Sequence, residues 1–149
     1  MHVREARDED IPAMSELLGV LFTQESEFTP DTERHKTGLR AILKDSTRGQ
    51  LLVLEDEGKV VGMLNLLFLP STALGITVGL LEDVVVKPTH RGCGGGALLM
   101  RRAIALAKAK GLGRLTLLTD SGNEAAQRFY TRHGFVGSAM RTMRLEIAE

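Results

Sequence analysis

A glycine-rich turn between an apolar strand and a helix is the stretch of this sequence best suited to chemistry. It runs Leu81-Glu82-Asp83-Val84-Val85-Val86-Lys87-Pro88-Thr89-His90-Arg91-Gly92-Cys93-Gly94-Gly95-Gly96-Ala97. Glycines let the backbone approach a ligand closely. The first N–H groups of a helix are unpaired and lie at the positive end of its dipole. The turn is therefore predicted to bind a phosphate or pyrophosphate, and Arg91 can add a charge-assisted hydrogen bond.

Three other interpretations of this turn are weaker. A P-loop needs a Lys followed by Ser or Thr after the last glycine, where Ala97-Leu98 stands instead. A dinucleotide fold needs its glycines tight against the strand and an acid about 20 residues later; here residues 87–91 intervene, and Asp120 imitates that acid from farther away. A turn that merely joins strand to helix leaves three consecutive glycines, each costing roughly 1 kcal/mol within a helix, without compensation.

The elements around this turn indicate one mixed α/β domain covering residues 1–149. Val3–Ala6, 50–55, 59–69, 77–86, 115–119 and 140–147 are expected to be strands, because they are apolar runs or alternate with period two. Apolar residues at helical spacing predict helices after Asp10, after Asp31 and over 94–110, and a short one over 123–133. The order is β-α-α-β-β-β-α-β-α-β, or the same with a further strand near the end.

Composition excludes several classes of protein. Lys plus Arg and Asp plus Glu each number 19, so the chain lacks the overall basic excess of a nucleic-acid-binding protein, although a local basic strip is compatible with this balance. One cysteine, Cys93, excludes an intrachain disulfide and a multi-cysteine zinc site. The histidines have no metal-ligand spacing, and no apolar run approaches ~20 residues. We expect a soluble, cytoplasmic protein without a metal, nucleic-acid or membrane partner.

Two segments resemble the signature motifs of the GNAT superfamily of acyl-CoA-dependent N-acetyltransferases. Arg91-Gly92-Cys93-Gly94-Gly95-Gly96 is similar to its Gln/Arg-x-x-Gly-x-Gly/Ala motif. Asn123-Glu124-Ala125-Ala126-Gln127-Arg128-Phe129-Tyr130-Thr131-Arg132-His133-Gly134-Phe135 is similar to its Asn-x-x-Ala-x-x-x-Tyr-x-x-x-Gly-Phe motif. The order of elements matches from end to end. The resemblance implies an α/β (α+β) GNAT fold with a central mixed, mostly antiparallel sheet of six or seven strands and about four flanking helices.

The resemblance also implies where acetyl-CoA binds. Backbone N–H groups of the turn would hold the pyrophosphate, and the strand before it would pair with the pantetheine arm through its main chain. That strand is expected to splay from its parallel neighbour over 115–119, which opens a gap for the thioester. Asn123 would bond the pantetheine or a water, or would simply cap its helix. The residues expected to bind the cofactor are Val84, Val85, Val86, Arg91, Gly92, Cys93, Gly94, Gly95, Gly96, Ala97, Asn123 and Tyr130.

By the same resemblance, Tyr130 is the expected general acid, since a phenol can protonate or hydrogen-bond the departing thiolate. An attacking amine must also lose a proton. Glu82 is the preferred base, while Asp83, Asp120 and water remain alternatives. Glu82 and Asp83 lie in an otherwise apolar strand, where unpaired carboxylates are costly. Neighbouring strand residues face opposite sides, so only one of the pair is expected to face the acceptor.

The expected activity is transfer of an acetyl group from acetyl-CoA to a primary amine by direct attack in a ternary complex. A non-catalytic module that senses acyl-CoA is the alternative from another class. Cys93 beside His90 is a weak candidate nucleophile. The acceptor, more plausibly a small molecule than a protein, would be shaped by the first two helices and the loop near residues 70–75. The protein is expected to be a monomer or a homodimer.

Overall fold

The computed structural model describes residues 1–25 and 27–148. The chain forms two compact units, residues 1–117 and 118–149, and each is described by itself. The first holds strands β1 (His2–Glu5), β2 (Gly49–Asp56), β3 (Lys59–Pro70), β4 (Thr77–Val86) and β5 (Leu115–Leu117). Its helices are α1 (Ile11–Gln24), α2 (Thr32–Leu43) and α3 (Gly95–Ala109), with short 3-10 turns η1 (Asp8–Asp10) and η2 (Pro88–His90).

The five strands form one sheet in the order β1-β2-β3-β4-β5. The first four are antiparallel to their neighbours, and only β5 runs parallel to β4. Glu57 and Gly58 join β2 to β3, both with positive φ (50° and 77°), the geometry of a tight two-residue hairpin turn. The two strands that it joins confirm those expected over residues 50–55 and 59–69.

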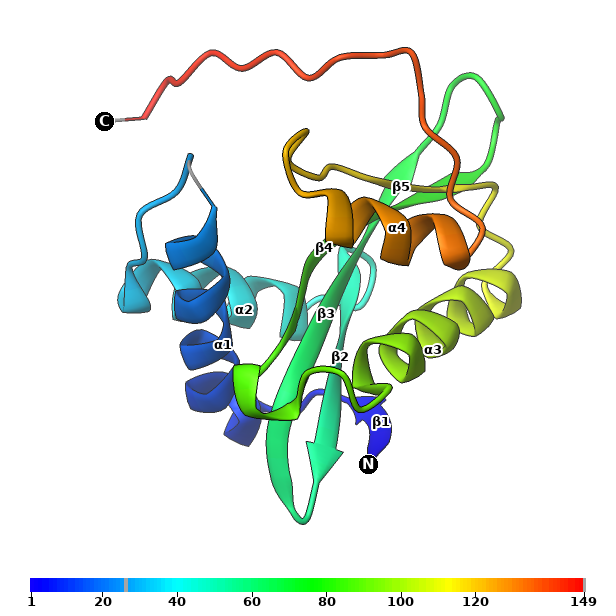
Figure 1. Cartoon of the computed structure of the whole chain (residues 1–149). Coiled ribbons are helices and arrows are strands. Elements are labelled where there is room, and N and C mark those ends of the chain that lie inside the picture. The colour runs from blue at the N-terminus through cyan, green and yellow to red at the C-terminus, as the bar shows by residue number, and fades with distance from the viewer. Residues whose placement is uncertain (26, 149) are drawn as a thin grey trace. The chain divides into compact units, whose positions relative to one another are not determined.

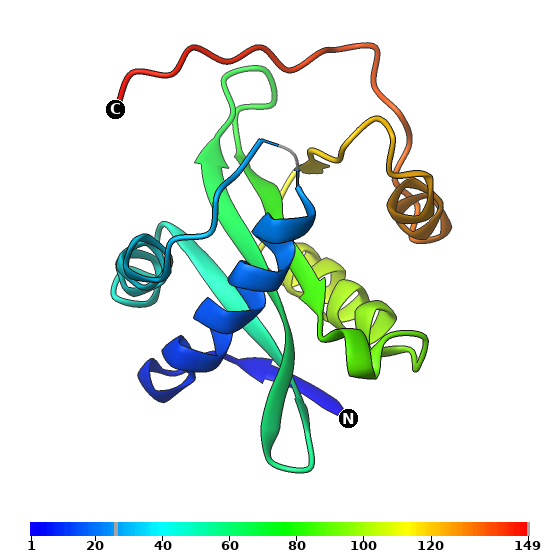
Figure 2. The same cartoon turned by 60° about the vertical axis from the view of Figure 1, so that its left-hand side comes forward.

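Helices α1 and α2 cover one face of the sheet, and α3 covers the other (Figures 1 and 2). The core under α1 and α2 contains the helical stripe predicted from the sequence, packed on alternate residues of the central strands: Ile11, Met14, Leu17, Leu18, Leu39, Leu51, Val53, Val60, Met63 and Val85. His35 joins the two helices, since its Nε2 accepts from the Asp31 N–H (3.0 Å) and its Nδ1 lies 3.4 Å from the Ser15 carbonyl oxygen. Burial of this stripe fixes α1 on the sheet.

The predicted strand over residues 140–147 is wrong for the described chain. This segment has no regular secondary structure, and the Met143, Leu145 and Ile147 side chains are 84–94% exposed. Alternating apolar residues supply a strand's side chains, but a strand also needs a neighbour for its N–H and C=O groups. The sheet therefore has five strands instead of six or seven, while the α/β class is confirmed.

The second unit contains one helix, α4 (Glu124–Arg132), close to the predicted 123–133. Its end is set by Gly134, whose φ of 95° is left-handed, and the Phe135 N–H returns to the Tyr130 carbonyl at 3.1 Å. In the described parts of the chain, no helix combines the length and apolar character that crossing a membrane would require.

Gly49→Ala tests the packing at the start of β2. A Cβ there would lie 2.6 Å from the Leu66 backbone oxygen and 3.2 Å from the Leu67 Cα, so the backbone must shift. We expect a loss of about 1–3 kcal/mol in the free energy of unfolding, measured by urea denaturation. Gly38→Ala is the matched control: it lies in α2 with open space around it and should gain about 0.5–1 kcal/mol. Equal effects of the two substitutions would contradict the packing described here.

Candidate active site

Strand β4 separates from its parallel neighbour halfway along its length. β5 pairs only with Gly79, Leu80 and Leu81, whereas β4 continues to Val86. Among the described residues, no strand pairs with Glu82–Val86 along that edge. Those backbone N–H and C=O groups of Val84–Val86 that face away from β3 are therefore available to hydrogen-bond an extended ligand, although the Val86 carbonyl oxygen also accepts from Arg91 Nε.

A β-bulge lies where β4 leaves β5. Met63 pairs with Val85 and Asn65 with Glu82, so Asp83 and Val84 together stand opposite Leu64 alone. Asp83 takes the left-handed φ of 56° that this requires. Because directly opposed residues share a face, Asn65 and Glu82 share one, and the Asn65 side chain also reaches Asp83. The extra residue interrupts the period-two alternation on which the expected opposite orientation of the two carboxylates was based.

Burial raises the pKa of both carboxyls. For Glu82, which is more than a third exposed, partial burial is the larger cause, and the neighbouring Asp83 carboxyl, when it is ionised, is the smaller one. For Asp83 burial raises the pKa, and a hydrogen bond from Asn65 Nδ2 to Asp83 Oδ2 (3.3 Å) opposes that rise. A carboxylate whose pKa is moved toward neutrality is a better general base.

The predicted anion-binding turn follows β4 directly. Gly92 and Gly94 have φ of 76° and 85°, which residues with a Cβ rarely adopt, and Gly94 is the N-cap of α3. No side chain caps this helix, so the N–H groups of its first turn remain available to a ligand. A Cβ on Gly95 would lie 2.5 Å from Leu54 Cδ2, so this glycine also lets α3 start close to the sheet.

The Arg91 side chain links the glycine turn to two neighbouring elements. Its Nε donates to the Val86 carbonyl oxygen (3.1 Å). When the Gln24 amide is oriented so that its oxygen faces Arg91, the two terminal guanidinium nitrogens lie 3.3 and 3.0 Å from that oxygen. The guanidinium thus ties the end of β4 and the last residue of α1 to the turn. The sequence identified Arg91 only as a charge for an anion, and Gln24 carried no motif that could have indicated its part.

Cys93 and His90 are not arranged as a nucleophile and its base. Cys93 Sγ lies 3.6 Å from the Arg91 carbonyl oxygen, whereas His90 contacts Thr89 Oγ1 at 2.9 Å and Asp56 at 3.4 Å. Within the described residues, no group of three His, Cys, Asp or Glu side chains could hold a metal ion.

Asn123 and Tyr130 belong to the second unit. Asn123 Oδ1 accepts from the Ala126 N–H at 3.1 Å, which is the N-cap role considered from the sequence. Tyr130 packs edge-on against Phe129 (ring centroids 5.4 Å apart) and Phe135 (5.9 Å). Within this unit, the two aromatic neighbours and the helix end at Gly134 fix the position of the Tyr130 ring.

Sequence reasoning missed Asn65. It is 3% exposed, yet its Oδ1 has no hydrogen-bond partner. The available signal was a single polar residue within an apolar strand, residues 60–69.

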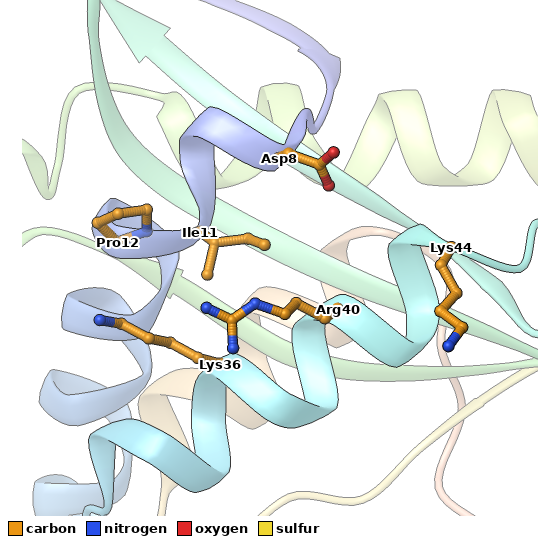
Figure 3. A pocket seen from close by; sticks show the side chains of 6 residues that line it. All are labelled: Asp8, Ile11, Pro12, Lys36, Arg40 and Lys44. Atoms are coloured by element: carbon orange, nitrogen blue, oxygen red, sulfur yellow. The ribbon is translucent and has the colours of Figure 1, made fainter.

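A separate open hollow of about 500 Å³ lies between the start of α1 and α2 (Figure 3), lined by Asp8, Ile11, Pro12, Lys36, Arg40 and Lys44. None of these residues belongs to β4 or the glycine turn.

Comparison with known proteins identifies the family of this chain. The model of the Acetyltransferase (GNAT) family matches residues 11–135, which include β4, the turn and α4. The chain belongs to this family, and it is an acyltransferase. Acetyl-CoA is the acyl donor of GNAT enzymes, whose acceptors are amines.

Individual relatives are similar over different shares of the chain. A Bacillus subtilis protein provisionally named a ribosomal-protein-alanine N-acetyltransferase is 29% identical over 93% of this chain and 83% of its own length. A Trypanosoma brucei glucosamine 6-phosphate N-acetyltransferase is 37% identical over 60% of this chain and 59% of its own. The structure of a provisionally named acetyltransferase from Agrobacterium tumefaciens superposes with a TM-score of 0.84 at 28% identity, covering 98% of this chain and 100% of that one.

Gly94→Ala tests the turn. Placing a Cβ at a φ of 85° costs about 1–2 kcal/mol, so the binding-competent turn is less populated. We expect the Kd for coenzyme A, measured by calorimetry, to rise about 5- to 30-fold. Gly19→Ala, a helical position with open space around it, should leave that Kd unchanged. An unaltered Kd for Gly94→Ala would contradict the role given to this turn.

Proposed function

We propose that the protein transfers the acetyl group of acetyl-CoA to a primary amine by direct attack in a ternary complex. The observation that carries this is the continuity of three features in residues 79–97. The pairing of β4 with β5 ends at Leu81, and two carboxyls with raised pKa, Glu82 and Asp83, follow directly. The glycine turn then leads to the start of α3, which no side chain caps.

The site fits coenzyme A in both of its binding chemistries. The first turn of α3 offers unpaired N–H donors for the pyrophosphate. The Glu82–Val86 edge offers backbone donors and acceptors to an arm that contains amides. Acetyl-CoA supplies the activated acyl group when bound. Val84, Val85, Val86, the residues of the turn from Arg91 to Ala97, Asn123 and Tyr130 are the proposed binding residues.

Glu82 is the proposed general base. Its carboxyl is accessible and its pKa is raised, so it can take the proton that the amine loses, directly or through one water. The amine nitrogen forms a bond to the acyl carbon as the carbon–sulfur bond breaks. Tyr130 gives its phenolic proton to the departing thiolate, so that an amide and a free thiol leave the site. Asp83, Asp120 and water are the alternatives for the base.

We propose a small primary amine as acceptor. The names of the two relatives describe N-acetylation of an alanine in a ribosomal protein and of glucosamine 6-phosphate, so both denote an amine acceptor and the second denotes a small one. A panel containing small amines, glucosamine 6-phosphate and a peptide with an N-terminal alanine, read by thiol release, separates these classes. Turnover of the peptide alone would overturn the small-molecule assignment, and no thiol release with any amine would favour the sensing module.

Tyr130→Phe removes the proposed acid and keeps the ring. We expect kcat to fall about 10²- to 10⁴-fold, measured by thiol release with the best amine of the panel. The Kd for coenzyme A should change far less than kcat, because Phe keeps the ring and its contacts with Phe129 and Phe135. Thr131→Val, one residue along α4, is the control and should keep kcat. Full activity of Tyr130→Phe would remove Tyr130 from the mechanism.

Glu82→Gln tests the base. A base acts when deprotonated, so kcat/KM of the parent enzyme should fall about tenfold per pH unit below the raised pKa of Glu82. The substitution should lower kcat/KM about 10²- to 10⁴-fold and abolish this acid limb. Glu16→Gln on the exposed side of α1 should change neither. A pH profile that survives in Glu82→Gln would assign the proton to another group or to water.

A further inference from the structure

One buried polar atom beside the β4 bulge lacks a hydrogen-bond partner among the described residues. Asn65 is almost completely buried, and its Nδ2 donates to Asp83 Oδ2 at 3.3 Å. Its Oδ1 accepts a hydrogen bond from none of the residues that the structure describes. An unpaired buried carbonyl oxygen is costly, so a donor is expected beside it.

Asp83 stands next to the Asn65 amide, and among the described residues of the elements packed on β4 no cation offsets its charge. β5 carries no titratable residue, and β3 carries only Lys59, at its far end. α1 offers only Glu16, and α3 offers Arg101, Arg102 and Lys108, all four of them exposed. Glu82, on the same strand, is itself acidic. Burial raises the pKa of the Asp83 carboxyl, and the Asn65 hydrogen bond is the one influence that lowers it.

We propose that Asp83 holds a proton in the resting enzyme and donates it to Asn65 Oδ1, so that acid and amide form a closed pair with two hydrogen bonds. This pair gives Asn65 Oδ1 a hydrogen-bond donor and keeps the hydrogen bond from Asn65 Nδ2 to Asp83. Asp83 is then a positioning residue that fixes the bulge. One consequence rests on the proposed function: because Asp83 is neutral, Glu82 is the ionised carboxylate of the strand. Asp83 is then excluded as the base.

Asp83→Asn is the sharpest variant, because an amide reproduces both hydrogen bonds without a titrating group. Asn also tolerates the left-handed φ of this position. Infrared spectroscopy at neutral pH should show a protonated-carboxyl C=O stretch in the parent protein that Asp83→Asn lacks and Glu82→Gln keeps. The exchanged pair Asn65→Asp/Asp83→Asn should restore the band, because it restores one acid and one amide. No such band in the parent protein would overturn the proposal.

The pH dependence of stability gives a second readout. A carboxyl whose pKa is higher in the folded than in the unfolded chain stabilises most at low pH, and this contribution is lost as pH rises. The folding constant of the parent relative to Asp83→Asn should fall about tenfold per pH unit above the unfolded Asp value of ~3.9. That fall should continue past neutrality. A ratio that levels off below neutral pH means an ionised Asp83 and overturns the proposal.

Kinetics provide a readout that a merely structural role would not move. If Asp83 is already neutral, Asp83→Asn leaves the acid limb of kcat/KM at the pH found for the parent. If Asp83 is ionised, removing its charge lowers the pKa of Glu82 and shifts the limb to lower pH by on the order of one unit, which contradicts the pair. The infrared and stability measurements need no turnover, so the pair can be supported even if Glu82 proves not to be the base.

Discussion

The site depends on one constraint, which is that every backbone polar group of a buried strand needs a partner. β4 meets it through β3 on both sides of the bulge, but through β5 only as far as Leu81. Beyond that point the strand keeps its place because β3 holds it from the other side. The edge of Glu82–Val86 can therefore accept an extended ligand without disrupting the sheet. Glycine packing supports the junction, since a Cβ on Gly79 would lie 2.6 Å from Leu115 Cδ2.

The bulge at Asp83 places two carboxyl groups at this strand edge. One extra residue opposite Leu64 brings both carboxyls next to Asn65, while Val85 stays paired with Met63 in the core beneath α1. A left-handed φ at a non-glycine residue stores strain, and the surrounding core and the Asn65 hydrogen bond hold it in place. Partial burial there raises the pKa of Glu82, which suits an acceptor of an amine proton.

The turn after β4 is held from two sides, so its open N–H groups are placed by rigid elements. Gly95 packs against Leu54 of β2, and Arg91 links the Val86 carbonyl to Gln24 at the end of α1. The helix expected to shape the acceptor side is thus bonded directly to the turn proposed to hold the pyrophosphate. The second unit carries Asn123 and Tyr130 on a helix that ends at Gly134.

The sequence alone determined the elements with a local signature and the family. The turn around Gly94, the hairpin at Glu57-Gly58, the stripe of α1 and both motifs depend on residues close in the chain. The tertiary structure decided what depends on pairing between distant segments. Residues 140–147 alternate correctly, yet they have no neighbouring strand and stay exposed. The equally regular alternation expected at Glu82 and Asp83 is interrupted by a bulge, because Asn65 and Leu64, on another strand, set the register. A β-bulge is a property of two strands together, so neither strand's sequence contains it.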